Sequence, residues 1–304
     1  MKLGINFFFT GHTIDVVTLA QASEKLGFDA LFVSDHTVMP DDPTLSYREH
    51  GPIPAVLGEL ADPFVSLGMA AAVTRHITLG TGICLVPERH PLTMAKAVAT
   101  LDNFSHGRVM LGVGVGWLKE ETEAYGLAFS DRWTYMDESV RAMKALWRDG
   151  VASSEGRLVN FPRVRCEPLP ASRPGPPVLL GTPATPVQCR RIAQQYDGWI
   201  ANGAGPGAIA RGRETILREY EAIGRDPSQL KIVAMGFDLS PETLRAYEAA
   251  GADMVVVALY NHPGTPMPLA GRMQQHQAMV YAPTPTPEQT LGALEKLAKL
   301  AGLQ

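Results

Sequence analysis

The amino-acid sequence predicts a (β/α)8 barrel, the TIM-barrel fold, with extended loops at one rim. Short apolar runs alternate with longer segments of helical periodicity, and eight such units follow one another along the 304 residues. Gly27 and Gly251 each stand just past a helical segment, where the left-handed C′ position favours glycine. Eight strands alternating with eight helices favour a closed barrel over a doubly wound sheet.

The elements are expected in order along a single domain that spans residues 1–304. Strands are expected at the runs rich in Val, Ile, Leu or Phe, which are 2–9, 30–35, 77–84, 109–116, 177–181, 198–202, 231–237 and 254–260. Helices are expected near 14–27, 63–74, 92–105, 132–148, 184–196, 206–223, 242–250 and 288–301.

Three connections exceed the usual length of about two to six residues. They are the insertions near 36–62, 149–176 and 261–286, all rich in Pro, Gly and polar residues. The first and the last follow strands, so we expect them at the carboxyl-terminal rim, where barrel active sites are built. The middle one follows a helix and is expected to hold a small hairpin or to be an insertion away from the chemistry.

Composition and charge point to small-molecule chemistry. The formal net charge is −4, and Lys and Arg are spread singly or in pairs, so no footprint for nucleic acid or an anionic membrane surface is present. No run of about 18 apolar residues is found that could span a membrane. Cys84, Cys166 and Cys189 form no C-x-x-C pair, which argues against a disulfide framework and a zinc site and favours a reducing cytoplasm.

The stretch "VMLGVGVGW" (109–117) carries three glycines at alternate positions. The spacing does not match the G-x-G-x-x-G fingerprint of dinucleotide-binding turns, and three βα units have already passed. In a strand, Gly112, Gly114 and Gly116 share the face toward the barrel axis, and Gly80 and Gly82 do the same on the preceding strand. Bare backbone on two adjoining strands indicates a close approach, either by a flat aromatic ring or by tight barrel packing.

Metal and Schiff-base chemistry are not expected. No strand ends in Lys, and the rim residues Asp35, His36, Asp238 and His262 are scattered over the second, seventh and eighth strands. Cofactor chemistry is therefore favoured, with no metal.

Four segments resemble the luciferase-like monooxygenase superfamily, and in particular its branch that uses the deazaflavin coenzyme F-420. They are "GFDALFVSDH", "TLGTGI", "RHPLTMAKAVATLDNFSHGRVMLGVGVGW" and "LLGTPATP" with a later "DGW", all within about residues 1–200. The resemblance implies a ring system held over strands two to four, beside Gly114 and Gly116. It also implies a non-prolyl cis peptide at Gly82–Ile83 that forms a bulge behind the ring.

Asp35 and His36 end the second strand. One interpretation is a capping Asp beside a satisfied His. Chemically, an imidazole titrates near neutral pH and can take a proton from a substrate hydroxyl as hydride leaves the same carbon. The resemblance favours this catalytic role for His36 and gives Asp35 the role of orienting the ring edge or the His.

The segment "GTPATP" (181–186) opens a helix after the fifth strand. The first turn of a helix exposes N–H groups that can hold a phosphate, and the hydroxyls of Thr182 and Thr185 can add to them beside Gly181. The resemblance implies the phosphate site of the cofactor here. The alternative is that Thr182 or Thr185 is an ordinary N-cap.

One position departs from the family pattern. Some deazaflavin enzymes that oxidise alcohols have a Glu directly after the glycine strand as a proton donor, and Trp117 stands here. Glu120 and Glu121 follow within one turn and replace that Glu only if their helix directs them inward.

These observations predict an oxidoreductase that transfers a hydride between F-420 and a small organic substrate. The alternatives are an FMN-dependent luciferase-like monooxygenase and a non-catalytic flavin- or deazaflavin-binding protein. The helices near 63–74 and 92–105 are more apolar than one buried face requires, so a homodimer is expected, unless their small residues simply pack on the barrel.

Overall fold

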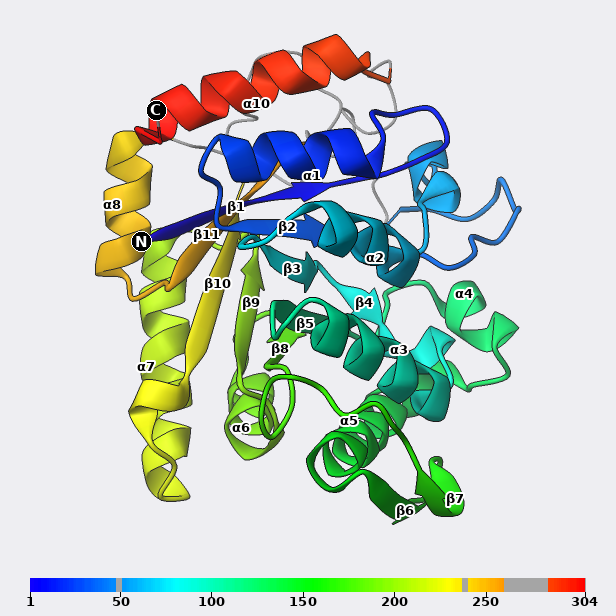
Figure 1. Cartoon of the computed structure of the whole chain (residues 1–304). Helices are drawn as coiled ribbons and strands as arrows, with labels where there is room; N and C mark the ends of the chain where they lie inside the picture. The colour runs from blue at the N-terminus through cyan, green and yellow to red at the C-terminus, as the bar shows by residue number, and fades with distance from the viewer. Residues whose placement is uncertain (48–50, 237–239, 260–283, 304) are drawn as a thin grey trace.

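The structure is a computed structural model that describes residues 1–47, 51–236, 240–259 and 284–303. Within these ranges, parallel strands close into a barrel with helices on its outside, as Figure 1 shows. The ring order is β1, β2, β3, β5, β8, β9, β10 and β11, with β11 pairing back onto β1. The predicted (β/α)8 fold is therefore confirmed.

Each predicted apolar run forms one of the barrel strands. Their bounds are β1 (Lys2–Phe7), β2 (Ala30–Val33), β3 (Thr78–Thr81) with its continuation β4 (Cys84–Leu85), β5 (Val109–Gly114), β8 (Val178–Gly181), β9 (Gly198–Asn202), β10 (Lys231–Gly236) and β11 (Met254–Ala258). β3 and β4 are parts of one strand position, interrupted at Gly82–Ile83, and both pair with β5.

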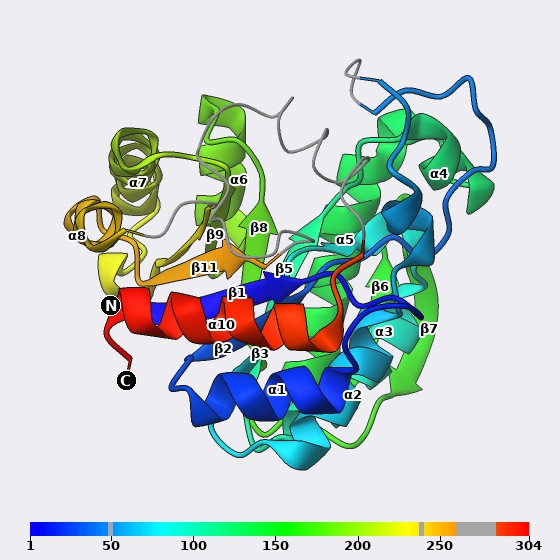
Figure 2. The same cartoon turned by 90° about the horizontal axis from the view of Figure 1, so that it is seen from above.

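The predicted helices are also found. They are α1 (Val16–Lys25), α2 (Pro63–Val73), α3 (Pro91–Phe104), α5 (Arg132–Asp149), α6 (Pro186–Gln195), α7 (Pro206–Ala222), α8 (Pro241–Ala249) and α10 (Pro287–Ala301), with a further short helix α4 (Lys119–Ala124). Gly27 and Gly251 both have φ of +87°, as their position past a helix predicts. Seen from above, α10 lies beside α1, so the last helix covers the barrel next to the first (Figure 2).

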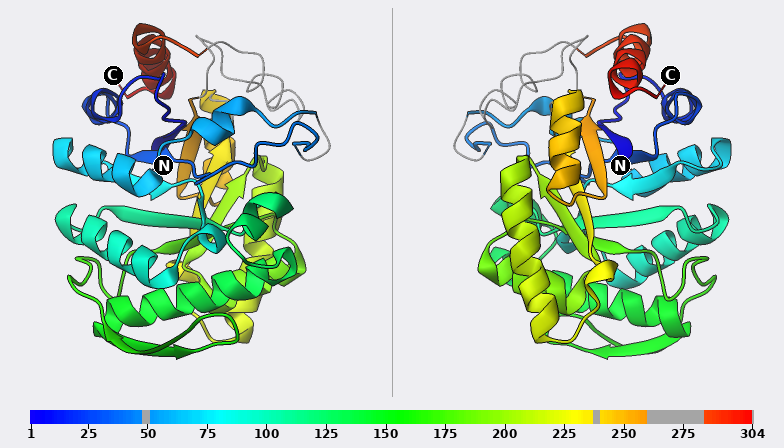
Figure 3. Two further views of the ribbon diagram at one scale, coloured as in Figure 1. Left: turned by 90° about the vertical axis from the view of Figure 1, so that its right-hand side faces the viewer. Right: turned by 90° about the vertical axis from the view of Figure 1, so that its left-hand side faces the viewer.

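The long connections differ in structure. The segment 149–176 contains the expected hairpin, formed by β6 (Val151–Glu155) and β7 (Asn160–Arg165), which packs beside α5 on the outside of the barrel (Figure 3). The segment 36–62 contains the 3-10 helix η1 (Ala55–Glu59). Most of 261–286, including His262, lies outside the described residues, as does Asp238.

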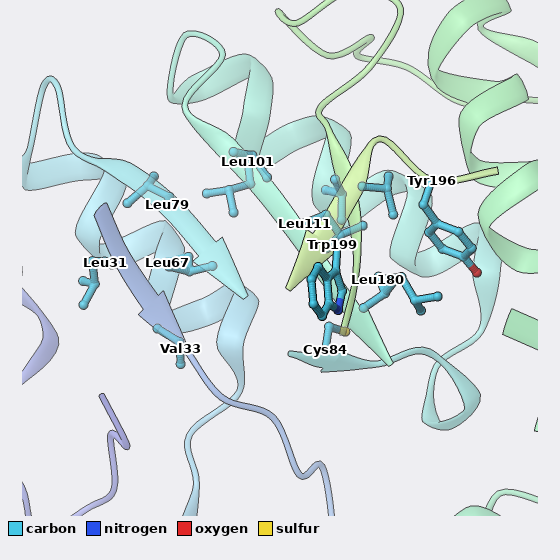
Figure 4. Close-up of a cluster of buried hydrophobic side chains, with 14 of the residues drawn as sticks. Leu31, Val33, Leu67, Leu79, Cys84, Leu101, Leu111, Leu180, Tyr196 and Trp199 are labelled. Carbon is cyan, nitrogen blue, oxygen red and sulfur yellow. The ribbon is translucent and has the colours of Figure 1, made fainter. Parts of the chain in front are cut away.

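The core has two layers because side chains alternate along each strand. Leu31 and Val33 of β2 point outward into the layer between strands and helices, where Figure 4 shows them with Leu67 of α2 and Trp199 of β9. The neighbouring residues on β2 point into the barrel. This interior cluster is made of Ala30, Phe32, Leu179, Ile200, Val233, Met235, Met254 and Val256.

The glycines of β3 and β5 face the barrel interior, as predicted, but the chain's own side chains fill the space beside them. A Cβ on Gly80 would lie 2.5 Å from the ring of Phe32, and one on Gly112 would collide with Ile200 and with the backbone of Thr81. The expectation of a slot for a flat ring is therefore wrong at Gly80 and Gly112, where tight barrel packing, the alternative, explains the glycines. Contact of a cofactor with Gly82 and Gly114 stays a prediction.

None of the helices within the described ranges combines the length and apolar character that a membrane span needs.

Candidate active site

His36 and Glu121 meet at the carboxyl-terminal end of the strands. His36 follows β2 and Glu121 lies on α4, and Nδ1 of the imidazole lies 2.6 Å from Oε1 of the carboxylate. The side chain of Glu121 is fully buried and that of His36 is 10% exposed. α4 therefore directs Glu121 inward, as the replacement of the missing family Glu requires, whereas Glu120 is exposed.

A second buried carboxyl, that of Glu88, lies next to this pair. Glu88 ends the 3-10 helix η2 (Val86–Glu88), and its Oε2 accepts a hydrogen bond of 3.3 Å from the backbone N–H of Thr37. Burial, followed by repulsion from Glu121 and Asp35, raises the pKa of Glu88 to about 9. Glu88 was not among the predicted residues, because an acid in a rim turn has no periodicity to reveal that it is buried.

Asp35 has a different role from the one expected. Its carboxylate accepts two hydrogen bonds from Arg89, from Nη2 at 2.8 Å and Nε at 3.1 Å, and a third from the backbone N–H of Leu85 at 3.0 Å. The expectation that Asp35 orients His36 is therefore wrong, because Glu121 does so. Arg89 also pairs with Asp62, so the group links β2, β4 and the start of α2. A role of Asp35 at the edge of a cofactor ring stays a prediction.

The Gly82–Ile83 peptide is cis, as the resemblance implies. The carbonyl of Gly82 accepts a hydrogen bond of 3.0 Å from Ser34 Oγ, which in turn accepts one of 3.1 Å from Asn6 Nδ2. Asn6 is fully buried, and a polar residue inside the apolar run of β1 is the signal that could have identified it. The bulge is therefore held by side chains from β1 and from the end of β2.

Ile83 lies between the glycines that were expected to contact the ring. A Cβ on Gly181 would lie 2.7 Å from Ile83 Cγ2, and one on Gly114 would collide with Ile83 Cδ1. The space beside these two glycines is thus taken by Ile83, which is itself partly exposed. Gly116 lies beyond the end of β5 with φ of +74°, so a left-handed turn, not an inward strand face, requires glycine there.

Aromatic rings flank His36. Trp117 packs edge-on against the imidazole with centroids 6.3 Å apart, and Tyr47 packs edge-on against Trp117 at 5.0 Å. Tyr47 belongs to the long 36–62 segment, so that rim loop reaches the site. Trp117, the residue that departs from the family pattern, forms a wall beside the His.

The turn between β8 and α6 carries the predicted phosphate residues. Thr185 is the N-cap of α6 and accepts a hydrogen bond of 3.4 Å from the N–H of Gln188, so the capping interpretation is confirmed for it. Thr182 is buried, and its carbonyl accepts a hydrogen bond of 2.7 Å from Trp199 Nε1. Thr185 is an exposed residue, and the phosphate role of this turn stays a prediction.

Among the residues that the structure describes, no group of three His, Cys, Asp or Glu is arranged to hold a metal ion.

The family model for luciferase-like monooxygenases matches residues 10–278 of the chain. The protein belongs to the luciferase-like monooxygenase family. This luciferase-like protein is 34% identical over 265 residues to an uncharacterised protein of Mycobacterium tuberculosis, with 85% of this chain and 92% of that one covered.

Two further relatives of the luciferase-like protein use different cofactors. The F420-dependent hydroxymycolic acid dehydrogenase of Mycobacterium tuberculosis is 29% identical over 220 residues, which cover 71% of this chain and 56% of that enzyme. The oxygenase component of the flavin-dependent trigonelline monooxygenase of Acinetobacter baylyi is 27% identical over 169 residues, which cover 55% and 42%. The family thus includes both F420-dependent and flavin-dependent oxidoreductases.

The fold also matches that of solved structures over most of the chain. The coenzyme F420 dependent tetrahydromethanopterin reductase of Methanopyrus kandleri superimposes with a TM-score of 0.68, at 16% identity, over 97% of this chain and 98% of that one. At this identity the likeness is one of fold.

Proposed function

We propose that the protein is an oxidoreductase that transfers a hydride between coenzyme F-420 and a small organic substrate. The observation that carries this proposal is the 2.6 Å pair of His36 and buried Glu121. His36 closely follows Ser34, the residue that holds the cis Gly82–Ile83 peptide. The F420-dependent dehydrogenase among the relatives supports the choice of coenzyme.

The residues at this edge of the barrel fit such a coenzyme. Ile83 is apolar and partly exposed, so it can support a planar ring from behind. In the first turn of α6, Pro186 has no N–H and the N–H of Gln188 already donates to Thr185. The N–H of Val187 and the hydroxyl of Thr185 are therefore the groups that this turn can offer to a phosphate. When bound, the deazaflavin supplies a carbon that accepts or gives a hydride; the protein supplies orientation and proton handling.

His36 is the residue that we expect to move the substrate proton. Because Nδ1 donates to the carboxylate of Glu121, Nε2 is the nitrogen that accepts a proton from a substrate hydroxyl. The negative charge of Glu121 then stabilises the imidazolium that forms. The same geometry returns the proton to the oxygen when a carbonyl is reduced.

The alternative is an FMN-dependent monooxygenase, which the flavin-dependent relative favours. A non-catalytic cofactor-binding protein is a third possibility. We further propose a cytoplasmic location, in keeping with three buried free cysteines, and a small-molecule partner rather than nucleic acid or a membrane.

Titration of the purified protein with F-420 and with FMN tests the cofactor. We expect F-420 to bind, with a change in its absorbance and fluorescence, and FMN to bind more weakly. Tighter binding of FMN, with substrate-dependent consumption of oxygen when FMN is supplied in its reduced form, would favour the monooxygenase, and binding of neither would reject both enzymes.

We also propose a homodimer formed through α2. The helix, PFVSLGMAAAV, has no charged residue, and its outer face exposes Val65 by 65% and Met69 by 45%. Burying such a face removes apolar surface from water. Light scattering should give about twice the 32.8 kDa chain mass, and Val65→Asp with Met69→Asp should give 32.8 kDa. The control is Val187→Asp, at another exposed Val; a wild-type monomer would contradict the proposal.

A further inference from the structure

The buried carboxyl of Glu121 has one oxygen that the His36 contact does not explain. Oε1 accepts a hydrogen bond from the imidazole. Oε2 is buried, and no described residue donates a hydrogen bond to it. A buried carboxylate oxygen without a donor costs free energy, so a donor is expected beside it. The neighbouring acid is Glu88, which is 4% exposed.

Glu88 is placed so that its two oxygens have different surroundings. Oε2 accepts from the N–H of Thr37, and that bond is satisfied by either protonation state. Oε1 lies near the turn at Gly116, 3.9 Å from the position that a Cβ on Gly116 would occupy. η2, which ends at Glu88, packs against α4, which carries Glu121, and the two carboxyl groups interact. A proton on Glu88 turns this contact from a repulsion between two carboxylates into a hydrogen bond.

The charged and titratable groups around Glu88 come from several elements. They are Asp35 and His36 after β2, Cys84 on β4, Arg89 after η2, and Glu121 and Tyr125 on and after α4. Arg89 is held by Asp35 and Asp62, so its charge is already balanced by two carboxylates. No unshared cation in this set therefore compensates an ionised Glu88.

We propose that Glu88 is a positioning residue that works in its protonated form, its carboxylic O–H donating to Glu121 and fixing the carboxylate that holds His36. The carboxyl pair then presents one negative charge to the imidazole instead of two. This inference rests on the proposed function only in the use of His36 as the proton-transfer residue.

The pKa of Glu88, about 9, agrees with this geometry and gives the sign of the pH dependence. Between the ordinary value of 4.5 and about 9, the folded state holds a proton that the unfolded state has lost. The free energy of unfolding that Glu88 contributes is therefore fully present below pH 4.5 and is lost as the pH rises through about 9. Ionisation also removes the donor to Glu121.

The test is infrared spectroscopy of the cofactor-free protein at neutral pH, with Glu88→Gln and the exposed control Glu120→Gln. We expect the carbonyl stretch of a buried, protonated carboxylic acid in the wild type, its loss in Glu88→Gln and its retention in Glu120→Gln. The band should disappear from the wild type near pH 9. Absence of the band at neutral pH, or its persistence in Glu88→Gln, would overturn the proposal; the wild-type titration decides even if the variant does not fold.

Turnover provides the second readout, because the amide of Gln can both accept from Thr37 and donate to Glu121. We expect Glu88→Gln to keep kcat/KM near the wild-type value at neutral pH and to lack the decline that the wild type shows above about pH 9. Glu88→Leu, whose side chain has no donor, should lose turnover at every pH. Equal losses of turnover in Glu88→Gln and Glu88→Leu would contradict a positioning role. Failure of F-420 binding with the infrared band intact would reject the proposed function and leave this proposal standing.

Discussion

Replacing His36 by alanine should lower kcat by about 10²- to 10⁴-fold, the range that a positioned general acid or base contributes. The side chain is only 10% exposed and Glu121 fixes its orientation, so the imidazole is held in one position for proton transfer. Cofactor affinity should be unchanged, because the imidazole is assigned to the substrate proton.

Steady-state kinetics together with a cofactor titration measures this effect. His12→Ala, at an exposed His near the amino terminus, is the matched control and should keep wild-type turnover. The turnover of Glu121→Gln should lie between those of His36→Ala and His12→Ala. The amide oxygen still accepts a hydrogen bond from Nδ1 but carries no charge to stabilise the imidazolium. Wild-type turnover in His36→Ala would indicate a protein that binds the cofactor without reacting through this residue.

Replacing Asp35 by alanine should lower the free energy of unfolding by about 3–5 kcal/mol, as expected when one partner of a buried ion pair is removed. The Asp35 side chain is 1% exposed, and the variant leaves two N–H groups of Arg89 and the backbone N–H of Leu85 without their acceptor. Denaturant unfolding at neutral pH measures the loss.

The control for Asp35 is Glu214→Gln on the outer face of α7, which removes an exposed pair with Arg218 and should leave the unfolding midpoint where it is. The same experiment separates the two roles that Asp35 can have. A wild-type midpoint combined with lost turnover would make Asp35 a functional residue, as its place at the strand end first indicated, instead of a structural one.

The strands and helices could be predicted because their signals are local. The apolar run of β2 and the glycine that ends α1 each fit within about ten residues, and the eightfold repeat supplies the topology. The direction of the glycines on β5 followed from the same alternation. What fills the space beside these glycines could not be predicted in this way, because the side chain next to Gly112 is that of Ile200, on a strand distant in sequence.

The site was predicted only in part for a similar reason. His36 was found from its place at a strand end, whereas its partner lies 85 residues later on α4, whose orientation no periodicity sets. The cis peptide came from the family resemblance and was confirmed. Glu88 was missed because its chemistry depends on its burial beside Thr37 and Glu121, and burial of a residue in a rim turn cannot be inferred from the adjacent sequence.

The packed barrel interior affects how reactants can reach His36. Phe32, Ile200 and Met235 are buried between the strands, so side chains fill the described part of the barrel interior. Reactants are therefore expected to reach His36 from the carboxyl-terminal end of the strands. The packed interior stabilises the fold, whereas the segments at the carboxyl-terminal end of the strands are expected to select the substrate. Exchange of those segments can therefore redirect such a protein to another substrate without reworking the part that keeps it folded.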